Sequence, residues 1–342
     1  MKRLAVVHRD RQRVEVIEEE CPSPKAGQVL VKTLLSGISA GSEMLVYKGR
    51  VEPQLALDAS LPALAGAFEY PFKYGYSCAG EVVECGAGVE PGWIGKRVFA
   101  FNPHESLFNA FCADCIPLPA GVSFDQGVFL PNMETAVNLV QDGAALIGER
   151  LAVFGLGVVG LLTLTLLIPF PAVEVVAFEP IEKRRQFARQ LSAEHVFDPG
   201  AIDWPRWRTE LAGTCLAERG ADLTFEISGS RSALNQAIAV SGYGGRIVLG
   251  SWYGSTPVEV LLGSDFHRSR IQLVSSQVST IAPQLSGRWS KQRRINLAMD
   301  RIAQLDPGKW ISHRFSIEDS TMAFRLLAED PREVLQVVLT YP

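Results

Sequence analysis

The stretch that decides the fold is Arg150-Leu-Ala-Val-Phe-Gly-Leu-Gly-Val-Val-Gly-Leu-Leu-Thr-Leu-Thr-Leu-Leu167. Residues 151–154 are uncharged and β-prone, and the end of the stretch is leucine-rich at helical spacing. Between them, Gly155, Gly157 and Gly160 follow the G-x-G-x-x-G pattern. These glycines permit a tight turn, close approach of the backbone to a pyrophosphate, and close packing of helix on strand. The stretch therefore predicts the strand, turn and helix of a dinucleotide-binding unit.

The residues that follow extend this prediction. A second apolar run, residues 173–178, ends at Glu179, where an acid would bind the ribose 2′-hydroxyl. A carboxylate there favours NAD(H), whereas the neighbouring basic residues 183–185, Arg184 among them, leave NADP(H) as an alternative. The helix start supplies free N–H groups to the phosphates, so cofactor contacts are also expected at Leu156, Val158 and Val159.

The uncharged run from residue 151 to residue 173 is long enough to resemble a transmembrane helix. Glycines at its start and Pro169 and Pro171 near its end break the helix on both sides. A buried parallel strand followed by a buried helix produces the same apolar run. We therefore interpret it as part of a soluble protein.

Composition narrows the class of protein. The chain has 342 residues, 47% of them hydrophobic and 20% charged, with a net charge of −4. This length suits two domains, and the charge predicts no basic surface for nucleic acid or membrane. Six cysteines without a recognisable signal peptide favour reduced thiols and a cytoplasmic location.

Six motifs occur in order: Gly37-Ile-Ser39, Gly75-Tyr-Ser-Cys-Ala-Gly-Glu-Val-Val83, Gly95-Lys-Arg-Val98, Gly155–Gly160, Phe225-Glu-Ile-Ser-Gly229 and Gly245-Arg-Ile-Val-Leu-Gly250. Together they resemble the medium-chain dehydrogenase/reductase superfamily over nearly the whole chain. The resemblance implies an α/β fold, in which a Rossmann doubly wound parallel sheet (residues 124–280) is inserted into a β-rich GroES-like catalytic domain (residues 1–123 and 281–342). It also implies a cofactor cleft between the domains and a homodimer. Residues 36–43, the Gly75-Tyr76 start of the second motif and residues 248–253 are similar to those of bacteriochlorophyllide hydroxyethyl dehydrogenases.

The chain departs from the zinc-dependent members of this superfamily. Ser39 and Tyr76 stand where those enzymes carry Cys and His ligands, and Leu130-Pro131 stands near the third ligand position. A catalytic zinc needs three Cys, His or carboxylate ligands, so we expect no catalytic zinc. Cys112-Ala-Asp-Cys115 has only two of the four cysteines of a structural zinc site. It lies in residues 108–116, which alternate like a strand.

Without zinc, a side chain must handle the proton of an alcohol/carbonyl reaction. His104 is the first candidate, because histidine exchanges protons near neutral pH; the alternative is a surface or capping role. Glu134 is the second candidate. Alternatively, its carboxylate only complements the positive end of a helix dipole at a helix start. Tyr76 and Ser39 would line the pocket and bond a substrate oxygen. A His104–Glu134 metal site is a further alternative.

The resemblance also implies cofactor contacts further along the chain, at Thr135, Ile227, Ser228, Gly250, Ser251 and Gln277. The basic stretches 265–270 and 287–294 would suit an anionic substrate if they faced the cleft, or they form solvated surface. The aromatic residues at 70–76 and 252–253 indicate room for a large or flat substrate molecule. Alternatively, they belong to the core.

The sequence thus predicts a zinc-independent oxidoreductase that transfers hydride between NAD(P)(H) and a secondary alcohol or carbonyl. Two alternatives stay open. One is an NAD(P)H-dependent reductase of an activated C=C bond, with a proton from solvent or Tyr76. The other is a non-catalytic nucleotide-binding sensor.

Overall fold

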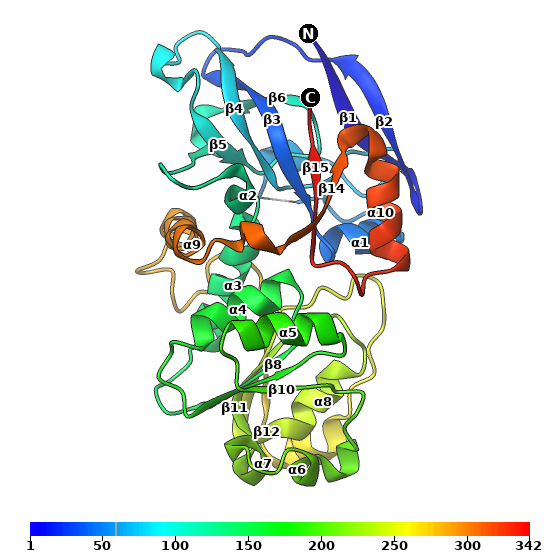
Figure 1. Ribbon diagram of the computed structural model, residues 1–342, viewed down its shortest axis with the longest axis vertical. Coiled ribbons are helices and arrows are strands. Elements are labelled where there is room, and N and C mark those ends of the chain that lie inside the picture. Colours follow the sequence, from blue (N-terminus) through cyan, green and yellow to red (C-terminus); the bar gives the residue numbers. More distant parts are fainter. Residues whose placement is uncertain (59) are drawn as a thin grey trace. The chain divides into compact units, whose positions relative to one another are not determined.

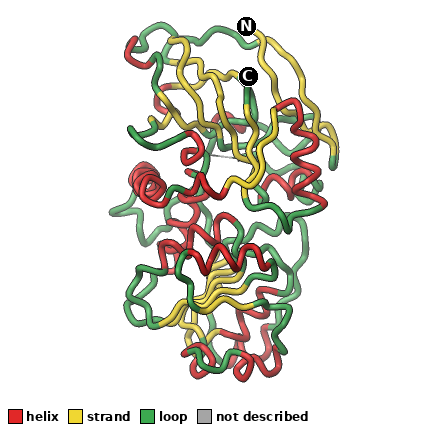
Figure 2. Tube along the Cα trace, in the orientation of Figure 1, coloured by secondary structure: helices red, strands yellow, loops and turns green. Residues whose placement is uncertain are grey.

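The computed structural model describes residues 1–58 and 60–342 and divides into two compact units. The first unit comprises Met1–Pro131, Gly254–Thr256 and Met299–Pro342. The second comprises Asn132–Tyr253 and Pro257–Ala298. Figure 1 labels the elements, and Figure 2 separates helices, strands and loops by colour.

A six-stranded parallel sheet in the order β10-β9-β8-β11-β12-β13 forms the centre of the second unit. The strand order reverses between β8 and β11. In a Rossmann sheet the two mononucleotide-binding halves meet at such a reversal. The predicted Rossmann sheet is therefore confirmed. Its strands are β8 (Arg150–Phe154), β9 (Glu174–Phe178), β10 (His195–Phe197), β11 (Ala221–Glu226), β12 (Ser241–Leu249) and β13 (Gln272–Ser275).

Helices cover both faces of this sheet, with α4 and α5 on one side and α8 on the other (Figure 1). Most of α4 is buried, so its apolar sequence encodes a core helix and not a membrane span. Among residues 1–58 and 60–342, no helix is both long and apolar enough to cross a bilayer. The helices are α3 (Leu130–Gly143), α4 (Val158–Leu167), α5 (Glu182–Gln190), η4 (Trp204–Arg206), α6 (Trp207–Glu210), α7 (Cys215–Arg219), α8 (Ala233–Val240), η5 (Leu262–Phe266) and α9 (Lys291–Leu305).

The first unit is β-rich. Its larger sheet has the order β14-β15-β3-β4-β5-β7, with β6 paired to β3, and β1 and β2 form a separate antiparallel pair. Both chain ends contribute to the larger sheet, since β15 pairs with β3. The strands are β1 (Lys2–Asp10), β2 (Arg13–Glu20), β3 (Gln28–Ile38), β4 (Cys78–Cys85), β5 (Arg97–Ala100), β6 (Leu107–Phe111), β7 (Cys115–Pro117), β14 (Ile311–Ser316) and β15 (Gln336–Thr340).

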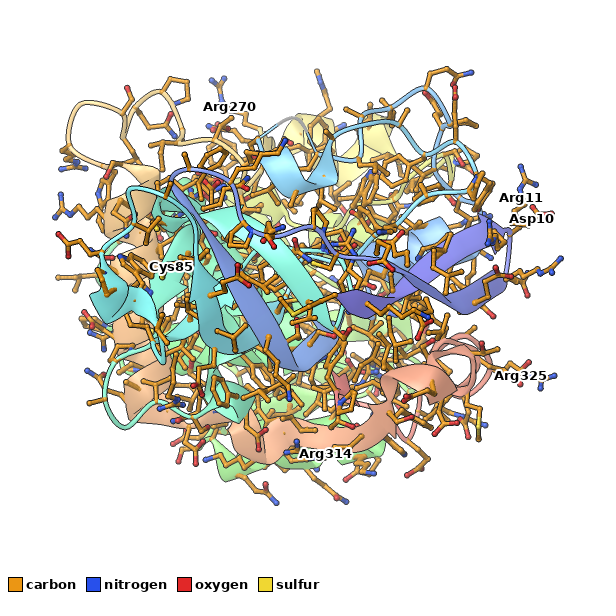
Figure 3. All side chains as sticks on the ribbon, turned by 90° about the horizontal axis from the view of Figure 1, so that it is seen from above. Asp10, Arg11, Cys85, Arg270, Arg314 and Arg325 are labelled. Carbon is orange, nitrogen blue, oxygen red and sulfur yellow. The ribbon has the colours of Figure 1, made fainter. Side chains whose placement is uncertain are left out.

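Short helices complete this unit, and α10 packs on the β1–β2 pair through Val6, Val14 and Phe324. In Figure 3 the side chains of Asp10 and Arg11, at the turn between β1 and β2, point outward. Neither β14 nor α10 was predicted from the sequence. The helices are α1 (Ser42–Tyr47), η1 (Pro62–Leu64), η2 (Pro91–Trp93), η3 (Cys112–Asp114), α2 (Phe124–Gly127), η6 (Pro307–Trp310), η7 (Ile317–Asp319) and α10 (Ser320–Glu329).

Candidate cofactor and proton-transfer sites

The glycine turn joins β8 to α4 at the carboxyl edge of the parallel sheet. Gly155 has a φ of 95°, and a Cβ there would lie 2.5 Å from Ser228 Cα. A Cβ on Gly160 would overlap the carbonyl oxygen of Gly155. A Cβ on Gly157, in contrast, would have no other atom of the described residues within 4 Å, so the outer face of Gly157 is open. This is the arrangement that lets a pyrophosphate approach the backbone at a helix N-terminus.

Glu179 directly follows β9 beside this turn. Its side chain is 2% exposed, and its carboxylate accepts hydrogen bonds from the N–H groups of Leu156 (2.7 Å) and Ile181 (3.0 Å). The carboxylate thus holds the glycine turn and still has lone pairs for a ribose hydroxyl. Burial lowers the pKa of the nearby Arg184, and the charge of Glu179 opposes that shift.

A second buried carboxylate, Glu226, ends β11 on the other side of β8. It accepts hydrogen bonds from Ser228 N (2.9 Å), Ser228 Oγ and Tyr253 Oη (2.7 Å), and Ser251 Oγ accepts one from Gly229 N (2.8 Å). These bonds join the two loops that carry four of the expected cofactor residues, namely Ile227, Ser228, Gly250 and Ser251. Glu226 was not predicted as a site residue, and Tyr253 was considered only as an aromatic residue near the substrate or in the core. An acid at the end of a buried strand was the available signal for Glu226.

Glu134 lies on α3 and is bound by an arginine. Nε and Nη2 of Arg294 donate to Glu134 Oε1 over 3.1 and 2.9 Å, and both side chains are buried. Burial raises the pKa of the Glu134 carboxyl, and the guanidinium of Arg294 limits that rise. Arg294 belongs to the basic stretch that was considered for an anionic substrate, yet its charge is directed to Glu134. Thr135 follows on the same helix.

The first unit contains a buried chain of hydrogen-bonded side chains around His104. His104 Nε2 lies 2.9 Å from Glu43 Oε2, and His104 Nδ1 lies 2.7 Å from Ser36 Oγ. Ser36 Oγ lies 2.6 Å from Tyr341 Oη. Glu43, His104 and Ser36 are all 0% exposed. With the proton on Nε2, each bond has one donor and one acceptor: Tyr341 donates to Ser36, Ser36 to His104, and His104 to Glu43.

Tyr76 and Ser39 lie at the Glu43 end of this chain. The N–H of Ser39 donates to Glu43 Oε1 over 2.8 Å. Burial and then the charge of Glu43 raise the pKa of Tyr76, whereas hydrogen bonds with the hydroxyls of Ser39 and Ser42 lower it. Gly75 has a φ of 117°, and a Cβ there would lie 2.7 Å from the His104 ring. The left-handed backbone at Gly75 therefore makes room for the imidazole.

The structure brings His104, Tyr76 and Ser39 together in the first unit. It places Glu134 in the second unit, with partners of its own. Gln277 is exposed and accepts a hydrogen bond from Ser279 N over 2.7 Å.

The expected strand over residues 108–116 is interrupted. The 3₁₀ turn η3 carries Cys112–Asp114 and separates β6 from β7. Cys115 is buried, and burial raises the pKa of its thiol to about 12. Cys85, labelled in Figure 3, packs with Cys112 against the same core. Within the described part of the chain, no group of three His, Cys, Asp or Glu side chains is arranged to hold a metal ion.

Two family models match the chain. Residues 25–129 match the alcohol dehydrogenase GroES-like domain, and residues 158–292 match the zinc-binding dehydrogenase domain. Together they cover most of both units.

Characterised relatives are similar in sequence. The (R,R)-butanediol dehydrogenase of Bacillus subtilis is 29% identical over 69% of this chain and 73% of its own length. The D-xylulose reductase of Saccharomyces cerevisiae is 26% identical over 66% of this chain, and the match spans 60% of its own length. An alcohol dehydrogenase of Escherichia coli, solved with NADH, has the same fold, with a TM-score of 0.78, 20% identity and 99% of each chain covered. The chain belongs to the medium-chain dehydrogenase/reductase superfamily, the alcohol dehydrogenase-like oxidoreductases that use NAD or NADP.

Proposed function

We propose that this chain transfers a hydride between NAD(P)(H) and a secondary alcohol or the corresponding carbonyl, without zinc. The observation that carries the proposal is the glycine turn with its open face at Gly157, beside the buried carboxylate of Glu179. The turn and the start of α4 would hold the pyrophosphate, and Glu179 would hold the adenosine ribose. Glu179 favours NAD, and Arg184 supports NADP as the alternative. The bound nicotinamide supplies or accepts the hydride.

The chemistry of the available donors supports zinc independence. Ser39 and Tyr76 offer hydroxyl groups, and Leu130–Pro131 offers no side-chain ligand, whereas zinc sites use thiolate, imidazole or carboxylate. The nearest imidazole and carboxylate, those of His104 and Glu43, are bonded to each other. No step of the proposed mechanism therefore uses a metal.

The proton would move at the Glu43 end of the buried chain of hydrogen-bonded side chains. Tyr76 and Ser39 would bond the substrate oxygen, because both are hydroxyl groups next to Glu43. His104 is 0% exposed, so it would not touch the substrate, and it would act only through Glu43, by donating its Nε2 hydrogen to that carboxylate. Glu134 is left out of this role because Arg294 binds its carboxylate.

The substrate class follows from the relatives. The two relatives above are named for a vicinal diol and a ketose, both of which carry secondary alcohol or ketone groups. We propose a small-molecule substrate with such a group and a homodimeric, cytoplasmic enzyme that binds neither nucleic acid nor membrane.

Elemental analysis of the purified protein, combined with NADH and NADPH titrations followed by fluorescence, tests this function. We expect tighter binding of NADH and no stoichiometric metal. Turnover would then be measured with 2,3-butanediol, xylitol and sorbitol, and with a panel of enones. One zinc per chain would refute the metal-free mechanism. Turnover of enones alone would move the assignment to C=C reduction, and failure to bind either nucleotide would overturn the oxidoreductase assignment.

A further inference from the structure

The segment that follows β13, residues 276–280, is fastened to α3 and β12. Ser276 N donates to Leu249 O over 3.0 Å. Ser276 Oγ donates to Asp142 Oδ2 over 2.7 Å and accepts from Asn138 Nδ2 over 2.8 Å. The segment leaves the sheet at its carboxyl edge, where Rossmann sheets bind nucleotides.

The same segment is also held by Arg294, which projects from α9. Besides its bonds to Glu134, Arg294 Nη1 donates to Thr280 O over 3.0 Å and to Asn138 Oδ1, and Nη2 donates to Val278 O. Arg294 is 0% exposed. We call Arg294, its ion pair with Glu134 and its bonds to the carbonyl oxygens of Val278 and Thr280 the arginine clamp.

The clamp sets the path of the main chain. A guanidinium without water is stable only where a carboxylate and further acceptors satisfy its planar set of donors. Two of the acceptors here are carbonyls of the segment, one on each side of Ser279. Moving the segment would therefore break hydrogen bonds of a buried charge. The backbone around Gln277 is fixed, although the Gln277 side chain is exposed.

We propose that Arg294, held by Glu134, is a positioning residue for the nicotinamide half of the cofactor. The inference rests on the proposed function. The glycine turn and Glu179 belong to β8 and β9, which form part of the first nucleotide-binding half of the sheet and take the adenosine and pyrophosphate. The segment after β13 belongs to the second half. The clamp thus pre-organises the main chain that receives the nicotinamide, and pre-organisation strengthens binding by reducing the ordering that binding requires.

This assignment predicts different effects on the binding of two ligands, NADH and ADP-ribose. NADH carries the nicotinamide ring to the segment after β13, whereas ADP-ribose keeps the adenosine, the pyrophosphate and the second ribose but lacks that ring. Loosening the clamp should weaken the binding of NADH and leave the affinity for ADP-ribose unchanged. A role in the general stability of the unit would change both affinities together.

The experiment is calorimetric titration of the full-length chain with NADH and with ADP-ribose. For Arg294→Lys, which keeps the charge and loses the planar fork, we expect the Kd for NADH to rise roughly tenfold. For Glu134→Gln we expect a rise of roughly threefold to fivefold, because the amide oxygen can still accept both bonds that Oε1 accepts but carries no charge. The Kd for ADP-ribose should stay within about twofold of the wild-type value in both variants.

Glu149→Gln is the matched control. It weakens the Glu149–Arg246 ion pair (2.7 Å) directly before β8, at the amino edge of the same sheet, and should change neither affinity. Equal weakening of NADH and ADP-ribose, or an unchanged NADH affinity in Glu134→Gln, would overturn the proposal. Should Arg294→Lys fail to fold, Glu134→Gln still decides between these outcomes. If the wild-type chain binds neither ligand, the proposed function itself fails, and this inference fails with it.

Discussion

Replacing His8 by phenylalanine should remove a large part of the sensitivity of this protein to acid. His8 lies on β1, is 0% exposed, and neither ring nitrogen has a hydrogen-bond partner among the described residues. Its ring stacks on Phe72 (5.3 Å between centroids) and meets the edge of Phe324 (5.4 Å). Burial, assisted by the nearby His104, lowers the pKa of His8 from 6.5 to about 3.

The magnitude follows from proton linkage. The folded state keeps His8 neutral down to about pH 3, whereas the unfolded chain takes up a proton below about pH 6.5. Stability is therefore unaffected by His8 above pH 6.5 and falls as the pH drops from 6.5 towards 3. At pH 4.5, about two units below the unfolded pKa, the loss in the free energy of unfolding is about 2.7 kcal/mol. Phenylalanine has a similar ring and no titration.

The assay is urea unfolding of wild type and variant between pH 7.5 and 4.5. Comparing the two proteins at each pH cancels the titration of all other groups. We expect the variant to gain about 2.5 kcal/mol relative to the wild type over this range. His267→Gln, at an exposed histidine, is the control and should leave the pH dependence as it is. A difference between His8→Phe and wild type that stays constant with pH would refute the reasoning.

Further predictions concern the glycine turn and the buried chain. Gly157→Ala should keep the wild-type melting temperature but weaken NADH at least about tenfold in a fluorescence titration, because its Cβ fills the open face. Gly160→Ala should instead lower the unfolding free energy by about 1–3 kcal/mol in urea, because its Cβ overlaps Gly155 O; equal behaviour of the two variants would contradict this. Glu43→Ala should destabilise the fold by about 3 kcal/mol, because it leaves His104 unpaired, and Glu43→Gln by clearly less. Similar losses in these two variants would contradict a stabilising role of the hydrogen bond between His104 and Glu43.

Zinc independence predicts that dialysis against a chelator leaves NADH affinity and turnover unchanged. The Tyr76→Phe variant should lose about 100-fold or more in turnover while its NADH affinity stays at the wild-type value, because its hydroxyl is proposed to handle the proton. Full activity of Tyr76→Phe, measured with any substrate the wild type accepts, would remove Tyr76 from the mechanism.

The sequence by itself determined the nucleotide-binding sheet. The G-x-G-x-x-G turn, the apolar runs on both sides of it and Glu179 are local patterns, and the order of strands and helices can be read directly from their spacing. The sequence also predicts a site without zinc, because Ser39 and Tyr76 offer hydroxyl groups and are poor zinc ligands, and this stays a prediction.

Only the tertiary structure decided what the titratable residues do. Glu134 was a candidate for proton transfer, but its partner Arg294 lies 160 positions further along the chain. His104 was expected to meet a substrate, but folding buries it between Glu43 and Ser36. Likewise, β14 and α10 were not predicted from the sequence. The strand β14 depends on its pairing with β15, and the helix α10 depends on its packing against β1 and β2. The protonation and role of a side chain depend on burial and on nearby charges, and these arise when distant segments meet and not from local spacing.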